Sequence, residues 1–101
     1  MTSYRAVLVV GLLRPGADPA DVLPAAAEAA RAVTKVEARD LAVVAGEARV
    51  VVRYLASDDA SARRIGDRVH ARVRGLAEVD RLAVDRRDGP RWHPVGPRPS
   101  R

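Results

Sequence analysis

Cysteine is absent from this chain of 101 residues, and so is phenylalanine. Without cysteine there are no disulfides, no thiolate nucleophiles and no cysteine-ligated metals or clusters, which suits a cytoplasmic protein. The chain contains only one methionine, one tryptophan and two tyrosines. Because alanine and valine dominate the apolar residues, the core has to be built from small side chains, and helices and sheet have to pack closely.

Long apolar runs are also missing. The run AVLVVGLL, residues 6–13, is too short to cross a bilayer, and a charged, turn-rich segment follows it in place of a signal-peptide cleavage site. We therefore interpret this run as a buried strand and expect no membrane partner.

Acidic residues are scarce only at the C-terminal end. The formal charge is +5, and seventeen of the eighteen basic residues are arginine. Residues 1–85 hold thirteen basic and twelve acidic groups, whereas residues 86–101 hold five arginines and one acid, Asp88. The surplus positive charge therefore belongs almost entirely to the last sixteen residues.

Turn signals and apolar periodicity predict six elements. Asp21 is favoured over Asp18 as the start of the first helix, because proline at position 24 is tolerated only in a first turn. Asp58 or Asp59 is expected to cap the second helix. The predicted strands are residues 4–12, 38–44, 48–56 and 80–86, with helices after the first and third.

The order β-α-β-β-α-β predicts an α+β fold, a ferredoxin-like split βαβ arrangement with a four-stranded antiparallel sheet and both helices on one face. Segments 33–43 and 76–84 resemble each other, since both lead from a helix end into Leu-Ala-Val, which supports two related halves. Asp88-Gly89 is a strong turn signal, so a short extra C-terminal strand is possible. We expect one domain over residues 1–95 and an extended basic tail over 96–101.

Alternation along the third strand assigns its two faces. Val50, Val52 and Tyr54 point to one side, whereas Arg49, Val51 and Arg53 point to the other. The arginine side is expected to be the one without helices. It carries no aromatic residue on this strand, so it lacks the stacking platforms of an RNA-recognition motif.

Motifs for catalysis are absent. The two histidines, His70 and His93, have no metal-ligand spacing with each other or with carboxylates, and no serine lies in a nucleophile motif. We predict no metal and no cofactor, and the balance is against an enzyme.

We predict a non-enzymatic binding or assembly domain that forms a homodimer through its sheet face. Its arginine-rich C-terminal segment would meet an acidic partner, either nucleic acid or protein, with Trp92 anchoring the segment on the body. The partner-binding candidates are Arg49, Arg53, Arg81, Arg86, Arg87, Arg91 and Trp92.

A second interpretation stays open. It is a small dimeric α+β enzyme or a small-molecule-binding protein with a pocket between the sheet and the C-terminal segment. Tyr54, Asp85 and His93 are its candidate pocket residues, beside Trp92 and Arg53.

Overall fold

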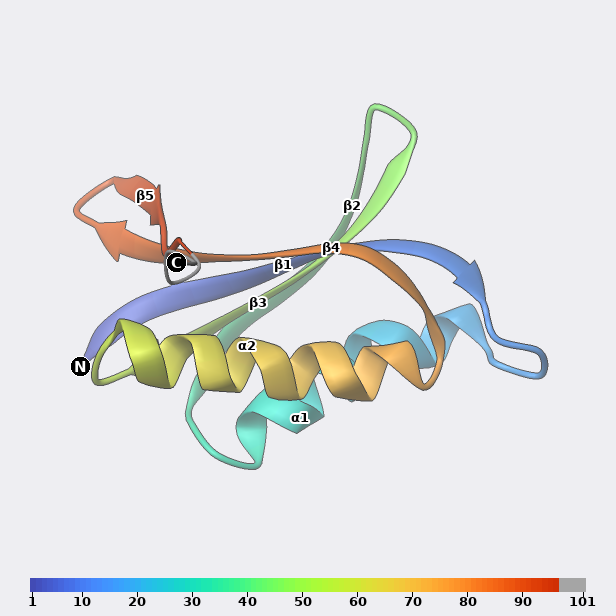
Figure 1. The fold of residues 1–101 in the computed structure, drawn as a ribbon, viewed down its shortest axis with the longest axis horizontal. Helices are drawn as coiled ribbons and strands as arrows, with labels where there is room; N and C mark the ends of the chain where they lie inside the picture. The colour runs from blue at the N-terminus through green and yellow to red at the C-terminus, as the bar shows by residue number, and fades with distance from the viewer. Residues whose placement is uncertain (97–101) are drawn as a thin grey trace, which may run out of the picture.

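The computed structural model describes residues 1–96 and shows a sheet with both helices on one side (Figure 1). The predicted basic tail, apart from Gly96, lies outside the described residues. The strands are β1 (Thr2–Leu13), β2 (Val36–Val44), β3 (Glu47–Ala56), β4 (Ala77–Asp88) and β5 (Arg91–Pro94). The helices are α1 (Val22–Arg31) and α2 (Asp59–Arg74), with a short 3₁₀ turn at Pro19–Asp21.

The sheet is antiparallel with the strand order β2-β3-β1-β4-β5, so the α+β class is confirmed. Among the described residues the sheet has five strands in place of the expected four, because the segment after Asp88 forms the short extra strand that the Asp88-Gly89 turn signal allowed. β4 is longer than predicted and continues to Asp88, and the chain reverses at Gly89, whose φ of 60° is in the left-handed region. Strand β5 then pairs with β4, with Arg91 opposite Asp88 at one end and Pro94 opposite Asp85 at the other.

Two aspartates begin the helical segments. The Asp18 carboxylate accepts a hydrogen bond from the Ala20 amide at 2.9 Å, with Pro19 in the first helical position, so the 3₁₀ turn precedes α1. The Asp58 carboxylate accepts from the Ser61 amide at 2.7 Å and caps α2. This bond stabilises the charged carboxylate and lowers the pKa of Asp58.

The core lies between the helices and one face of the sheet. Val50, Val52 and Tyr54 are fully buried there, as the alternation predicted. The helices approach the sheet closely because the side chains that they bury include alanines and, in α2, Gly66. A Cβ atom on Gly66 of α2 would lie 2.7 Å from Cγ2 of Val84, so this position has no room for a side chain.

Both tyrosines attach the first part of α2 to the sheet. The Tyr54 hydroxyl donates to the Ala62 carbonyl at 2.7 Å, and the Tyr4 hydroxyl donates to the Asp59 carboxylate at 2.7 Å. Arg86 binds the other oxygen of Asp59 at 2.8 Å. The hydrogen bond from Tyr4 is the main reason that the pKa of Asp59 is lowered, and the Arg86 charge acts in the same direction.

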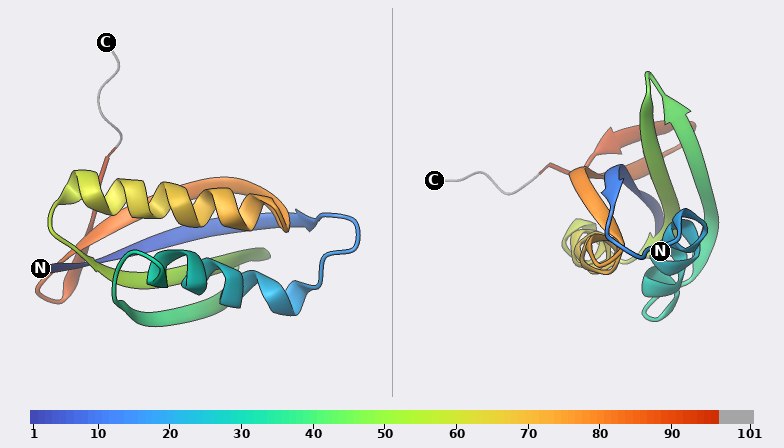
Figure 2. Two further views of the ribbon diagram at one scale, coloured as in Figure 1. Left: turned by 90° about the horizontal axis from the view of Figure 1, so that it is seen from below. Right: turned by 90° about the vertical axis from the view of Figure 1, so that its right-hand side faces the viewer.

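The side of the sheet without helices is concave. The tip of the β2–β3 hairpin and the β4–β5 hairpin both rise away from the helices (Figures 1 and 2). Ala45 and Gly46 form the two-residue turn between β2 and β3, with φ values of 52° and 80°. Neither described helix is long and apolar enough to span a membrane.

Candidate functional site

The open face of the sheet carries side chains in rows that run across the strands. Cross-strand pairing places Arg53 of β3 beside Arg5 of β1, and Arg5 beside Asp85 of β4. A second row holds Val51 and Val7. The third row consists of Arg49, Val9 and Arg81. Valines therefore separate two rows that contain arginine.

Carboxylates hold the first of these rows in place. Nε of Arg5 lies 2.8 Å from the Asp85 carboxylate, and Nε of Arg53 lies 3.3 Å from the Glu37 carboxylate. Both arginines are attached through Nε. Their terminal nitrogens make no hydrogen bond to any residue in the described part of the chain, so these donors are available to a ligand.

Trp92 lies among three arginines. Its ring centroid is 4.5 Å from the guanidinium carbon of Arg5, and 5.7 Å from those of Arg53 and Arg87. The pairing of Arg87 with Trp92 puts the indole on the open face, because directly opposite residues share a face. We call Arg5, Arg53, Arg87 and Trp92 the arginine–tryptophan cluster.

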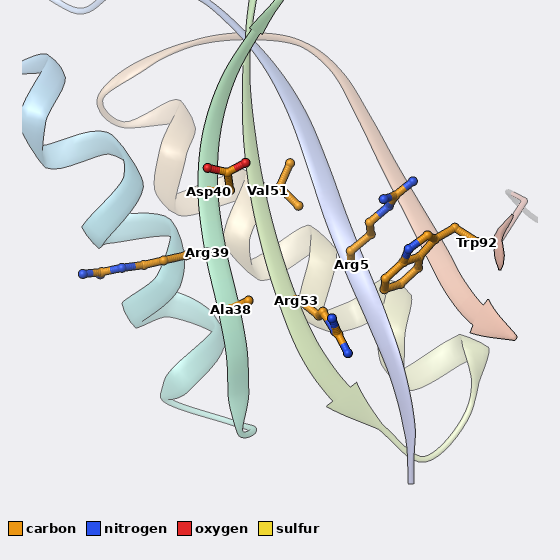
Figure 3. A pocket seen from close by; sticks show the side chains of 7 residues that line it. All are labelled: Arg5, Ala38, Arg39, Asp40, Val51, Arg53 and Trp92. Atoms are coloured by element: carbon orange, nitrogen blue, oxygen red, sulfur yellow. The ribbon is translucent and has the colours of Figure 1, made fainter. Parts of the chain in front are cut away.

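A pocket of about 230 Å³ adjoins this cluster (Figure 3). Trp92, Arg5 and Arg53 border it on one side, and Asp40 and Val51 lie on the other (Figure 3). Arg39 also lines the pocket, but its side chain extends from β2 toward the helices. The pocket therefore offers two cations, an aromatic surface and one carboxylate.

A second hollow of about 250 Å³ lies over the third row. Arg49 and Arg81 both approach the Glu47 carboxylate, at 3.1 and 3.3 Å. Their hydrogen bonds, that of Arg49 first, lower the pKa of Glu47. Glu47 therefore remains ionised and neutralises part of the charge in this row.

The structure brings together most of the predicted partner-binding residues. Arg49, Arg53, Arg81, Arg87 and Trp92 all lie on the open face. Arg86 and Arg91 lie on the other side of their strands, because each is one residue out of step with the open-face positions. Arg86 instead belongs to the contact with Asp59.

The predicted pocket residues are not brought together. Asp85 is on the open face, but Tyr54 is fully buried on the helix side. His93 pairs with Arg86 and faces away from Trp92, with Nε2 3.6 Å from Asp88. The pocket beside Trp92 is lined by other residues, so the three candidates do not form one site.

Several residues in or beside the candidate site were not among the predicted site residues. Arg5 was not selected, although it is the cation nearest Trp92. Glu37 lies at an irregularity between Val36 and Ala38, where the alternation that assigns faces is interrupted. Val95, which is 8% exposed and belongs to the core, also anchors the C-terminal segment.

Within residues 1–96, no group of three histidine, aspartate or glutamate residues is placed to hold a metal ion. The open face instead presents guanidinium groups, one indole and valine side chains. No family model, curated protein or solved structure matches this chain, so its function has to be inferred from this face.

Proposed function

We propose that this chain is a non-enzymatic binding domain that holds an acidic partner on the open face of its sheet. The observation that carries the proposal is the arginine–tryptophan cluster. Four strands contribute to it, and three guanidinium groups gather on one indole ring.

Stacking on an aromatic ring suits this purpose, since it uses the flat surface of a guanidinium group and leaves its N–H edge free. The carboxylates of Asp85 and Glu37 occupy only Nε of Arg5 and Arg53. The terminal nitrogens then form a positioned set of donors for phosphate or carboxylate oxygens. Arginines that are already held in place lose less side-chain entropy on binding.

The test uses Trp92, the only tryptophan, as a fluorescent reporter. The full chain is titrated with a single-stranded oligonucleotide and, separately, with polyglutamate. We expect one of them to change the Trp92 emission, with an affinity that falls as salt rises. Arg53→Ala should weaken this binding about tenfold, the loss of one charge-assisted contact.

Arg72→Ala is the matched control, because Arg72 is an exposed arginine on α2, on the helix side of the sheet. Its binding should stay within about twofold of the parent chain. Equal weakening by both substitutions would mean that total charge, not this face, attracts the partner, and the proposal would be wrong.

The pocket beside Trp92 supports a second candidate function, the binding of a small anion between the sheet and the C-terminal strand. Its volume of about 230 Å³ suits a ligand of only a few non-hydrogen atoms. Binding is better supported than catalysis here, because Asp85 is already held by Arg5. Saturable quenching of Trp92 by inorganic phosphate, but not by the polymers, would favour this candidate.

Other parts of the sequence-based interpretation remain within this proposal. They are a ferredoxin-like arrangement of β1 to β4, a cytoplasmic location and self-association through the sheet face. Val7 and Val51, the partly exposed valines of the second row, are the feature that supports face-to-face association. Such a dimer would cover the arginine–tryptophan cluster, so raising the protein concentration should then weaken binding of the acidic partner.

A further inference from the structure

Strand β2 forms one edge of the sheet, and its outer side has no partner in the described residues. The strand lies at the outer margin of the molecule in the right-hand view of Figure 2. Three of its apolar side chains are exposed, Leu41 by 54%, Val43 by 74% and Val44 by 43%. Its last part, residues 41–44, contains no proline and no charged residue, which are the residues that usually protect an edge from pairing.

The turn identifies which backbone groups of β2 are free. Val44 and Glu47 flank a two-residue turn, so they form a hydrogen-bonded pair with each other. Hydrogen-bonded and non-hydrogen-bonded positions alternate along an antiparallel strand. The pairing of β2 with β3 is regular from Val44 back to Ala38, so every second residue is a non-hydrogen-bonded position. The residues whose N–H and C=O groups point outward are therefore Arg39, Leu41 and Val43.

We propose that β2 of a second copy of this chain pairs with this edge in antiparallel orientation, about a two-fold axis at Leu41. In this register Leu41 lies opposite Leu41 of the second copy, and Arg39 lies opposite Val43 of the second copy. All three outward-pointing residues then find hydrogen-bonding partners. The inference does not depend on the proposed function, because it uses the edge and not the open face.

Charge and overlap select this register. An axis at Arg39 or Asp40 would place two identical charges directly opposite each other, which destabilises a strand pair. An axis at Ala42 or Val43 avoids this conflict but shortens the overlap, because the turn follows Val44. Leu41 is therefore the position that gives the longest pairing without opposed like charges.

A second copy also accounts for the exposure of Leu41. Leu41 and Val43 lie on the helix side of β2, where Leu41 pairs with the buried Val50 across the sheet. In the dimer the two Leu41 side chains would cover each other. An apolar groove of about 170 Å³, lined by Val10, Leu13 and Leu23 among others, adjoins Leu41 and enlarges this surface.

The geometry provides a sharp test, because the chain contains no cysteine. In the proposed register two Leu41 Cα atoms would be about 5.5 Å apart, within the range that a disulfide spans. Two Val43 Cα atoms would be about 14 Å apart along the strands, which is too far. Mild oxidation of Leu41→Cys should therefore give a disulfide-linked dimer at least about tenfold faster than oxidation of Val43→Cys.

Val43→Cys is a strict control, since Val43 is more exposed than Leu41 and random collisions would link it at least as readily. Equal rates for the two variants, or faster linkage at position 43, would overturn the register.

A second variant, Leu41→Pro, removes an N–H that points outward and leaves the β2–β3 hydrogen bonds intact. Sedimentation should show a dimer for the parent chain. The Leu41→Pro dimer should dissociate into monomers at a protein concentration at least about tenfold higher than the parent dimer does. An unchanged circular dichroism spectrum would show that the variant still folds. A parent chain that stays monomeric, or a dimer unaffected by Leu41→Pro, would overturn the proposal.

Discussion

The helix-covered face and the open face of the sheet are formed by alternate residues of the same strands, yet they differ in almost every physical property. At the centre of the covered face the apolar and tyrosine side chains of β1 and β3 are buried, and each tyrosine hydroxyl has a single partner. On the open face most side chains, Val51 and Trp92 among them, are partly exposed, and charges are paired at the surface. The covered face should therefore determine stability, whereas the open face should determine binding.

The largest expected effect tests the covered face at its tightest point. Gly66→Val would force side-chain atoms into the 2.7 Å approach to Val84, so we expect a loss of about 3 kcal/mol in the free energy of unfolding. Urea denaturation followed by circular dichroism measures this. Gly75→Ala is the control: it lies at the end of α2 with more room, and it should change stability by less than about 1 kcal/mol. Similar stability for the two variants would contradict the close packing.

Removing one hydroxyl group should have a smaller effect. Tyr54→Phe loses the buried hydrogen bond to the Ala62 carbonyl and should cost about 1 to 2 kcal/mol in denaturant unfolding. Tyr4→Phe should cost less, since Asp59 keeps its ion pair with Arg86. A neutral Tyr54→Phe would mean that this hydroxyl does not hold α2 on the sheet.

High pH should weaken the covered face through the same tyrosines. Burial, and then the hydrogen bond to Asp59, raise the pKa of Tyr4 from its ordinary value of 10.0 to about 12. Burial also raises the pKa of Tyr54. The unfolded chain therefore loses these protons first, so stability is complete below pH about 10 and falls as pH rises toward about 12.

At pH about 11 the loss from Tyr4 alone should be about 1 kcal/mol. Urea unfolding at several pH values measures it, and Tyr4→Phe should make the dependence shallower. If the free energy of unfolding falls equally steeply with pH in the parent chain and in Tyr4→Phe, Tyr4 does not contribute to the pH dependence.

The smallest expected effect on stability comes from the open face. Arg53→Ala should change the free energy of unfolding by less than about 1 kcal/mol, because Arg53 takes part in a partly exposed ion pair and a distant contact with Trp92. Denaturant unfolding beside the fluorescence titration shows whether stability and binding separate. A loss of stability as large as that of Gly66→Val would remove the distinction between the two faces.

Much of the fold could be predicted because it depends on local chemistry. Alternation separated Val50 and Val52 from Arg49 and Arg53 correctly, and one of the two predicted capping candidates, Asp58, caps α2. The candidate site was predicted less completely. Arg86 was selected for its charge and its place in a basic segment. It is the neighbour of Arg87 on β4, so it points to the opposite face of the sheet and pairs with Asp59 of α2.

Pairing partners could not be predicted, because they come from different parts of the chain. Nothing near Arg5 in the sequence indicates Asp85, eighty residues away, or Trp92 beyond it. These contacts depend on β4 and β5 lying next to β1 in a particular register. A turn signal such as Asp88-Gly89 shows that the chain reverses, but not which side chains the reversal brings together.

Local features of the sequence were sufficient to predict the α+β class, the positions of the helices, the small-residue core and the excess of arginine in residues 86–101. These properties follow from the periodicity, the capping residues and the composition, which are all local. The tertiary structure alone decided that Trp92 lies among arginines from three other strands and that β2 remains an open edge. Both outcomes depend on strand order and register, which arise only when distant segments pair.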